Sequence, residues 1–307
     1  KEAMSAAGNG SLLSSDSAPA PWDPFRGPLD SIQPWQFRLL AAVMLLVTSL
    51  SLAENLAVIL VTFKFQQLRQ PVNYIIVNLS VADFLVSLTG GTVSFLTNLK
   101  GYFFMGYWAC VLEGFAVTFF GTVALWSLAL LALERCLVLS RSRSPRRTHA
   151  GLGIAFTWAF SFLCTCPPTA GWSSYTTSKI GTTCEPNWYS GAPADRTYII
   201  TFFTTCFVVP LFVILVSYGK VVWKLKKASD AQGRLGSTRR PERQVTRMVV
   251  FMIIAFLICW MPYATFAILV TAHPSIELDP CLAAIPAFFS KTATVYNPII
   301  YVFMNKK

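Results

Sequence analysis

Apolar residues gather in seven long stretches of this chain, and short polar segments separate them. The stretches cover residues 37–63, 72–99, 107–139, 149–171, 196–224, 244–272 and 281–303. Each is longer than the roughly 20 apolar residues with which a helix crosses a bilayer. A helix also satisfies its own backbone hydrogen bonds, as lipid requires. The pattern therefore predicts an all-α membrane protein, a seven-transmembrane helix bundle.

Composition and charge agree with this prediction and orient the bundle. Of the 307 residues, 54% are hydrophobic and only 13% are charged, about half of the roughly 25% usual in soluble proteins. Among the 25 Lys and Arg residues, 18 fall in segments on one side of the membrane, six on the other and one within the last stretch. Because basic residues favour the cytoplasmic side, the N-terminus is predicted to lie outside. This distribution accounts for the net charge of +11 without a nucleic-acid partner.

The segment before the first stretch differs in composition from the rest. Residues 1–36 are rich in Ser, Ala, Pro and Gly, which predicts a disordered extracellular tail. Asn9 begins an Asn-Gly-Ser acceptor for glycosylation, which fits an outside location. Residues 37–307 are predicted to form a single seven-helix bundle that lacks a C-terminal tail.

One charged residue, Lys291, falls ten residues inside the last stretch. That is roughly 15 Å along a helix, too far for the side chain to reach water. An ammonium at the bilayer centre costs about 2.5–3.5 kcal/mol on insertion scales. A buried lysine amine also forms Schiff bases with carbonyl ligands. Lys291 is therefore either an attachment point for such a ligand or an ordinary ion-pair residue in a polar cavity.

Carboxylates in the other stretches are candidate partners for this cation. Glu113 lies near the outer end of the third stretch, where an unpaired anion is costly, so it is the natural partner of Lys291. Asp83 and Glu54 are alternatives, but Asp83 belongs with Asn55 and Asn297 to a polar group that could hold a sodium ion or water. Glu54 has no evident partner, and its role is unassigned.

Two cysteines fall at the outside face, where disulfides persist. Cys110 begins the third stretch, and Cys184 lies in the polar segment after the fourth. We expect the two to pair and to tie the second outside loop over the mouth of the bundle. No nucleophilic triad or metal-binding pattern is present in the sequence, which predicts that the protein is not an enzyme.

The polar and aromatic residues of the spans together resemble those of the rhodopsin-like G-protein-coupled receptors. The resemblance covers residue 37 to the end and rests on Asn55, Asp83, Cys110, Glu134, Arg135, Trp158, Pro210, the run from Cys259 to Pro262, and Asn297, Pro298 and Tyr301. Lys291 in the seventh helix resembles the lysine that marks opsins. Residues 68–74, 124–128 and 286–291 are similar to vertebrate ciliary opsins, and residues 85–98 and 178–188 to their non-visual vertebrate ancient, pinopsin and parapinopsin groups.

The resemblance implies a chromophore and a site for it. Lys291 would carry 11-cis-retinal as a protonated Schiff base, with Glu113 as counterion. Some opsins use a glutamate six residues before the loop cysteine, but that position is Ser178 here, so Glu113 is the only candidate. The retinal pocket implied by the resemblance comprises Thr118, Gly121, Phe203, Phe207, Trp260 and Tyr263.

The resemblance also implies how the receptor is activated and which partners it binds. Arg135 would release Glu134 and Glu242, and the sixth helix would bend at Pro262. The remaining switch residues are Asn297, Pro298 and Tyr301. Expected partners are a heterotrimeric G protein of the Gi/transducin class, membrane lipid and, in a full-length form, arrestin and a receptor kinase. The expected location is the plasma membrane.

Three alternatives remain open on sequence grounds. A receptor for a diffusible ligand would use Lys291 as a plain ion-pair residue. A retinal photoisomerase would use the same lysine chemistry. A transporter or channel would more often show internal repeats or broken helices, and neither is evident in the sequence.

Overall fold

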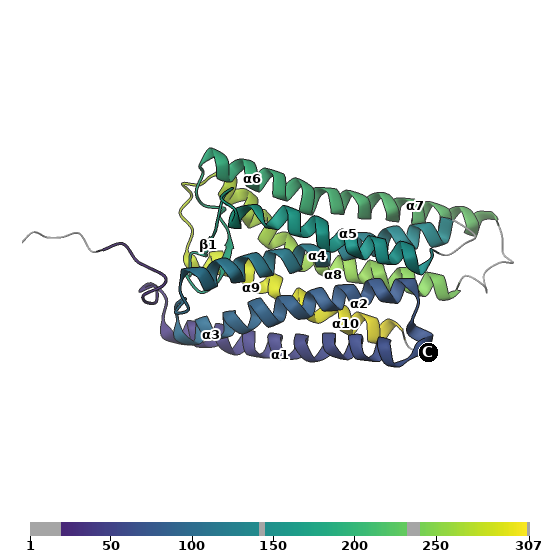
Figure 1. Ribbon diagram of the computed structural model, residues 1–307, viewed down its shortest axis with the longest axis horizontal. Coiled ribbons are helices and arrows are strands. Elements are labelled where there is room, and N and C mark those ends of the chain that lie inside the picture. Colours follow the sequence, from purple (N-terminus) through teal and green to yellow (C-terminus); the bar gives the residue numbers. More distant parts are fainter. Residues whose placement is uncertain (1–19, 141–144, 232–239, 306–307) are drawn as a thin grey trace, which may run out of the picture.

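The structure, a computed structural model, describes residues 20–140, 145–231 and 240–305 of the chain. Figure 1 shows its helices running side by side along the long axis. The first pass is α1 (Pro34–Lys64). The second is α2 (Pro71–Val86), continued by the π turn η2 (Ser87–Gly91) and α3 (Thr92–Lys100). The third is α4 (Tyr107–Ser140), and the fourth is α5 (Arg147–Thr165). The fifth pass is α6 (Pro193–Phe203), continued by the π turn η4 (Thr204–Val208) and α7 (Val209–Ala231). The sixth is α8 (Arg240–Ala272). The seventh is α9 (Pro280–Lys291) followed by α10 (Ala293–Met304).

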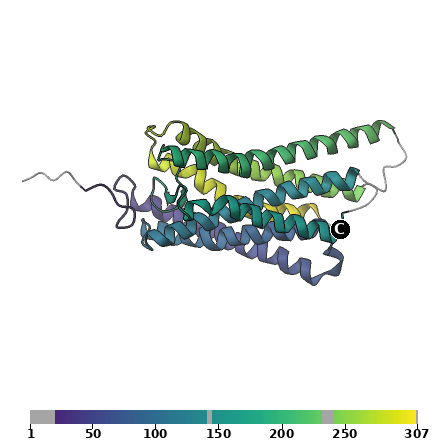
Figure 2. The ribbon, with the colours of Figure 1, turned by 45° about the horizontal axis from the view of Figure 1, so that its top comes forward.

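Short elements join these passes at both ends. They are the 3₁₀ turns η1 (Gln66–Leu68) and η3 (Pro167–Thr169) and the antiparallel strands β1 (Tyr175–Thr177) and β2 (Cys184–Pro186). The two strands lie at one end of the bundle, and α7 extends past its neighbours at the other (Figures 1 and 2).

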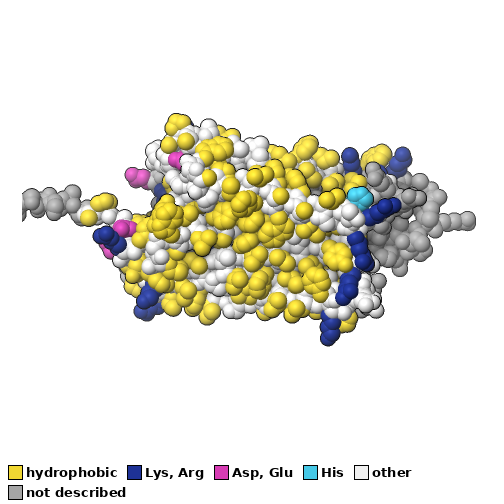
Figure 3. All heavy atoms as spheres, viewed as in Figure 1, with side chains coloured by type: hydrophobic (Ala, Val, Ile, Leu, Met, Phe, Trp, Pro, Cys, Tyr) yellow, Lys and Arg dark blue, Asp and Glu magenta, His cyan; other side chains and the backbone are white. Residues whose placement is uncertain are grey.

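The exterior of the bundle is apolar, as a membrane requires. Figure 3 shows hydrophobic side chains over the length of one face, with most Lys and Arg side chains at the end away from the strands. Six of the described helical passes are long and apolar enough to cross a membrane. The seventh pass is divided at Thr292, so neither α9 nor α10 is long enough alone. The predicted seven-helix bundle is confirmed.

The seventh pass contains a proline whose missing donor is replaced from another helix. Pro298 has no N–H, so the carbonyl of Thr294, four residues earlier, loses its helical partner. Asn55 Nδ2 on α1 donates to that carbonyl at 3.0 Å. The side chain of Asn55 thus stabilises the helix at the position where the proline would weaken it.

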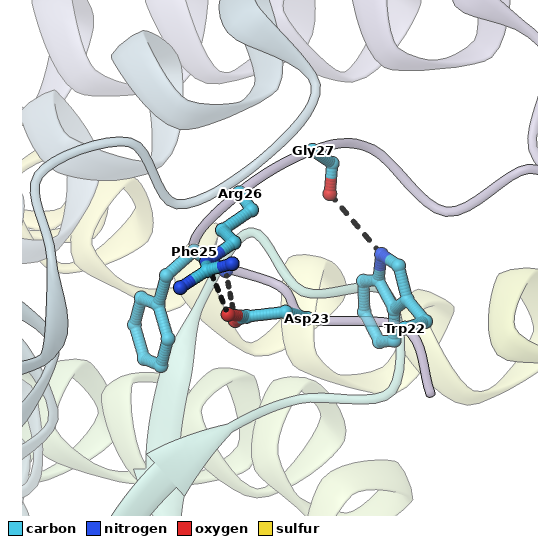
Figure 4. Close-up of polar contacts among 5 residues, drawn as sticks. All are labelled: Trp22, Asp23, Phe25, Arg26 and Gly27. Atoms are coloured by element: carbon cyan, nitrogen blue, oxygen red, sulfur yellow. Dashed lines mark hydrogen bonds and ion pairs between the residues drawn. The ribbon is translucent and has the colours of Figure 1, made fainter. Parts of the chain in front are cut away.

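The described part of the N-terminal segment is packed, which differs from the disordered tail predicted over residues 1–36. Figure 4 shows its turn: Trp22 Nε1 donates to the Gly27 carbonyl at 3.1 Å, and Arg26 pairs with Asp23 at 3.4 Å. Phe25 lies edge-to-face on Phe103, 6.1 Å between ring centroids. Large apolar side chains in this otherwise polar segment therefore hold it against the mouth of the bundle. Asn9 lies outside the described residues.

A buried asparagine links three of the helices, and its removal is expected to destabilise the bundle. Asn78 Nδ2 on α2 donates to Ser127 Oγ on α4 at 2.8 Å, and its Oδ1 accepts from Trp158 Nε1 on α5 at 2.6 Å. Asn78→Ala leaves the indole N–H without its acceptor, so we expect a loss of about 1–3 kcal/mol. Thermal unfolding in detergent measures the loss.

The matched control is a double-mutant cycle with Trp158→Phe. If the hydrogen bond carries the effect, the double variant is less destabilised than the sum of the two single variants, because both partners are removed together. Strictly additive losses would contradict this assignment.

Candidate functional site

A cavity lies inside the bundle beneath the strand β2, bounded by α4, the fifth pass, α8 and α9. The volume that the centre of a water molecule could occupy in it is about 140 Å³. One water molecule requires roughly a tenth of this volume. Most of its wall is apolar or aromatic. Three acidic or basic side chains also reach it, namely Glu113, Glu185 and Lys291. A mainly apolar cavity with a few convergent polar groups is typical of a small-molecule site.

Lys291 is the last residue of α9 and extends into this cavity. Its Nζ is buried and has no hydrogen-bond partner among the described residues. Nζ lies over the ring of Phe288, 5.4 Å from the ring centroid. No ion pair within 4.0 Å joins Lys291 to a carboxylate in the described part of the chain. Its amine is thus buried without a direct partner.

Glu113 lies on α4 and is held by the second outside loop. The structure contains the expected disulfide between Cys110 and Cys184, with 5.4 Å between their Cα atoms. This bond ties β2 to the outer end of α4. One turn deeper, the backbone N–H of Cys184 donates to Glu113 Oε2 at 2.8 Å. Glu113 and Lys291 therefore line the same cavity with opposite charges, and no ion pair within 4.0 Å joins them.

The six residues predicted for the pocket all lie on the cavity wall: Thr118, Gly121, Phe203, Phe207, Trp260 and Tyr263. Trp260 stacks on Phe256, with 5.8 Å between ring centroids, and lies edge-to-face with Tyr263 at 5.9 Å. Its indole also faces Gly121, where even a methyl group would be in van der Waals contact. The wall is therefore closely packed around the Trp260 side chain.

Glu185, which was not predicted from the sequence, also lies in the cavity. It directly follows Cys184 on β2 and is 6% exposed. Tyr189 and Tyr263 donate their hydroxyls to its two oxygens, at 2.5 and 2.6 Å. Burial raises the pKa of this loop carboxyl above its ordinary value. The only sequence signal was its place next to the loop cysteine, and a glutamate in a polar loop is normally read as solvated.

Residues 54–301 match the 7 transmembrane receptor (rhodopsin family). The chain is 67% identical over 288 residues to Opsin-VA of Rutilus rutilus, which covers 93% of this chain and 75% of that protein. The chain belongs to the opsins.

A second relative supports this assignment, and a solved structure matches the fold. The opsin is 64% identical over 288 residues to Vertebrate ancient opsin of Salmo salar, covering 93% of this chain and 88% of that protein. The crystal structure of squid rhodopsin matches its fold with a TM-score of 0.84 at 24% identity, over 90% of this chain and 84% of that one. The protein is thus a light-sensing G-protein-coupled receptor of the plasma membrane, not an enzyme, and it couples to a heterotrimeric G protein.

At the cytoplasmic end of this opsin, the predicted switch residues whose side chains the structure describes are buried. Arg135 Nε and Nη2 donate to the two oxygens of Glu134 at 2.6 and 2.7 Å. The side chain of Glu242 lies outside the described residues. Pro298 and Tyr301 are buried in α10. The bidentate pair holds the Arg135 guanidinium against α4 itself.

The predicted polar network lies midway along the opsin. Asn297 Nδ2 on α10 donates to Asp83 Oδ2 on α2 at 3.0 Å. Asn55 does not bond Asp83. Its amide donates to Ser51 Oγ at 3.1 Å and to the Thr294 carbonyl instead. Glu54 projects from α1 with one buried oxygen that has no hydrogen-bond partner in the described part of the chain, so nothing in the structure assigns it a role.

Proposed function

We propose that this opsin is a non-visual photoreceptor pigment that binds 11-cis-retinal as a protonated Schiff base on Lys291. Glu113 is its counterion, and the activated receptor engages a G protein of the Gi/transducin class. The observation that carries the proposal is the buried amine of Lys291, which has no hydrogen-bond partner among the described residues and opens on an aromatic cavity.

The cavity suits retinal, an apolar aldehyde. Condensation of the lysine amine with an aldehyde releases water and leaves a nitrogen that is cationic when protonated. The apolar wall would accept the hydrocarbon part, and Glu113 provides a charge opposite to the nitrogen. Retinal, when bound, supplies absorption of visible light and a change of shape at a double bond.

Glu113 would keep the proton on the nitrogen at residue 291. An opposite charge nearby favours the charged form of a group, whereas burial alone disfavours it. The backbone N–H of Cys184 fixes the carboxylate in this position. The pair also links α4 to α9 electrostatically, so loss of the proton would remove a constraint between these two helices.

Movement of α8 would then carry the signal to the cytoplasm. Trp260 lies on the cavity wall, and Pro262 follows it in the same helix, where a bend costs least. At the other end of α8, Gln244 Nε2 donates to the carbonyl of Met304 on α10 at 2.6 Å. An outward swing of α8 would break this hydrogen bond and open the end of the bundle next to Arg135. A local charge change that biases one two-state element is a known type of switch.

Light-dependent nucleotide exchange tests this function. The opsin, incubated with 11-cis-retinal in the dark and placed in lipid nanodiscs, is mixed with purified heterotrimers of the Gi, transducin, Gs and Gq classes. We expect illumination to accelerate exchange on Gi and transducin and to leave Gs and Gq unchanged. A rate of nucleotide exchange that illumination does not change, as expected for a receptor for a diffusible ligand, would contradict the proposal. A preference for Gs or Gq would contradict the coupling class.

A further inference from the structure

A second carboxylate, Glu185, is built into the cavity from the loop side. Successive side chains of a strand point to opposite faces. The Cys184 side chain joins α4 through the disulfide, so Glu185, the next residue of β2, points away from that bond toward Tyr263 of α8. The strand that positions Glu113 through its backbone therefore also carries a carboxylate of its own into the site.

Phenol and indole groups hold this carboxylate in place. Tyr189 and Tyr263 each donate a hydroxyl to one of its oxygens. Trp188 Nε1 in turn donates to the hydroxyl oxygen of Tyr263 at 3.0 Å. Hydrogen bonds to an ionised carboxylate are stronger than those between neutral groups, so the arrangement suits an anion with a fixed position.

The cation that faces both carboxylates has no contact with either of them. Glu113 and Glu185 both line the cavity into which Lys291 extends. Within the described residues neither is within 4.0 Å of Nζ. One cation cannot balance two buried anions, and an uncompensated buried charge is costly. One of the carboxyls must therefore hold a proton over part of the pH range.

Glu185 is placed to be that carboxyl. The groups that face it are Glu113 from α4, Tyr263 from α8, Lys291 from α9, and Tyr189 from its own loop, whose ring lies 5.6 Å from Lys179 Nζ. A second, smaller cavity lined by Ser178, Thr183, Glu185 and Tyr189 lies between the loop and α9. It has room for about one water molecule, on the loop side of the carboxyl. Burial also raises the pKa of Glu185.

We propose that Glu185 is a second carboxylate of the chromophore site, which shares with Glu113 the positive charge at residue 291 and takes up a proton on acidification. This inference rests on the proposed attachment of retinal to Lys291. An anion near the cationic nitrogen stabilises the ground state more than the excited state, in which the positive charge has moved away from the nitrogen. Loss of the anion therefore moves absorption to longer wavelength.

The first test compares dark absorption of the retinal-loaded wild type and Glu185→Gln over a pH series. We expect the wild type to shift to longer wavelength on acidification, and Glu185→Gln to start at the longer wavelength and lose that shift. Glu277→Gln, which changes an exposed loop glutamate, is the matched control and should behave as the wild type. An unchanged maximum and pH response in Glu185→Gln would overturn the inference, and so would a shift to shorter wavelength.

A second test needs no chromophore. Infrared difference spectra of retinal-free membranes between two pH values should show a carboxylic acid band that Glu185→Gln lacks. Tyr189→Phe keeps the carboxyl but removes one donor to its ionised form, so the band should appear at higher pH than in the wild type. The same band in Glu185→Gln would overturn the inference. A wild type without any visible absorption would instead refute the proposed function, so the two failures are distinguishable.

Discussion

Lys291→Ala is expected to abolish the visible pigment completely. Lys291 provides the only amine among the described residues that line the cavity, so no other side chain there can form the covalent bond to an aldehyde. The measurement is the absorption spectrum of purified protein after incubation with 11-cis-retinal in the dark, before and after illumination. The wild type should show a visible band that light removes, and the variant should show only free retinal.

Lys179→Ala is the matched control for this variant. Lys179 lies on the same loop as the cavity roof, beside the ring of Tyr189, but does not line the large cavity. Its loss should leave the visible band in place. A light-sensitive band that persists in Lys291→Ala would contradict the attachment site.

Glu113→Gln is expected to shift the pigment from visible to ultraviolet absorption at neutral pH. Without the carboxylate of Glu113, Glu185 alone does not hold the buried nitrogen at residue 291 in its charged form at neutral pH, and the nitrogen releases its proton. Acidification should restore the visible band. Spectra of the variant over a pH series measure both effects.

Glu54→Gln provides the control for this change because Glu54 is also a membrane glutamate but lies on α1, outside the cavity wall. Its spectrum should match the wild type. In Glu113→Gln combined with Glu185→Gln, the visible band should return only at lower pH than in Glu113→Gln alone. A visible band in Glu113→Gln at neutral pH would assign the main counterion role to another group, with Glu185 the first candidate.

Hydropathy predicted the seven passes closely because each must match the thickness of the membrane. It did not predict the π turns in the second and fifth passes. At Gly90 and Gly91 in the first of these, an added Cβ would overlap Val117 of α4 or Thr48 of α1. The turn thus lies where three helices approach closely, a tertiary feature that no local pattern records.

Part of the site could also be predicted from the sequence. Lys291 and Glu113 were found because a charge within an apolar span requires a partner. Glu185 carried no such signal, since its burial depends on the fold of the loop across the mouth of the bundle. The packing of residues 20–33 was missed likewise. Trp22, Phe25, Leu29 and Ile32 are isolated large apolar side chains in a polar segment, and they contact distant parts of the chain.

Chemical mapping of the residue that carries retinal is the decisive experiment for the proposed pigment. The wild-type opsin is incubated with 11-cis-retinal in the dark, reduced with borohydride to make any carbon–nitrogen double bond permanent, digested, and analysed by mass spectrometry. The account predicts a retinyl group on the Nζ of Lys291 and on no other residue. Folded protein with an unmodified Lys291, or with the retinyl group on a different lysine, would contradict it.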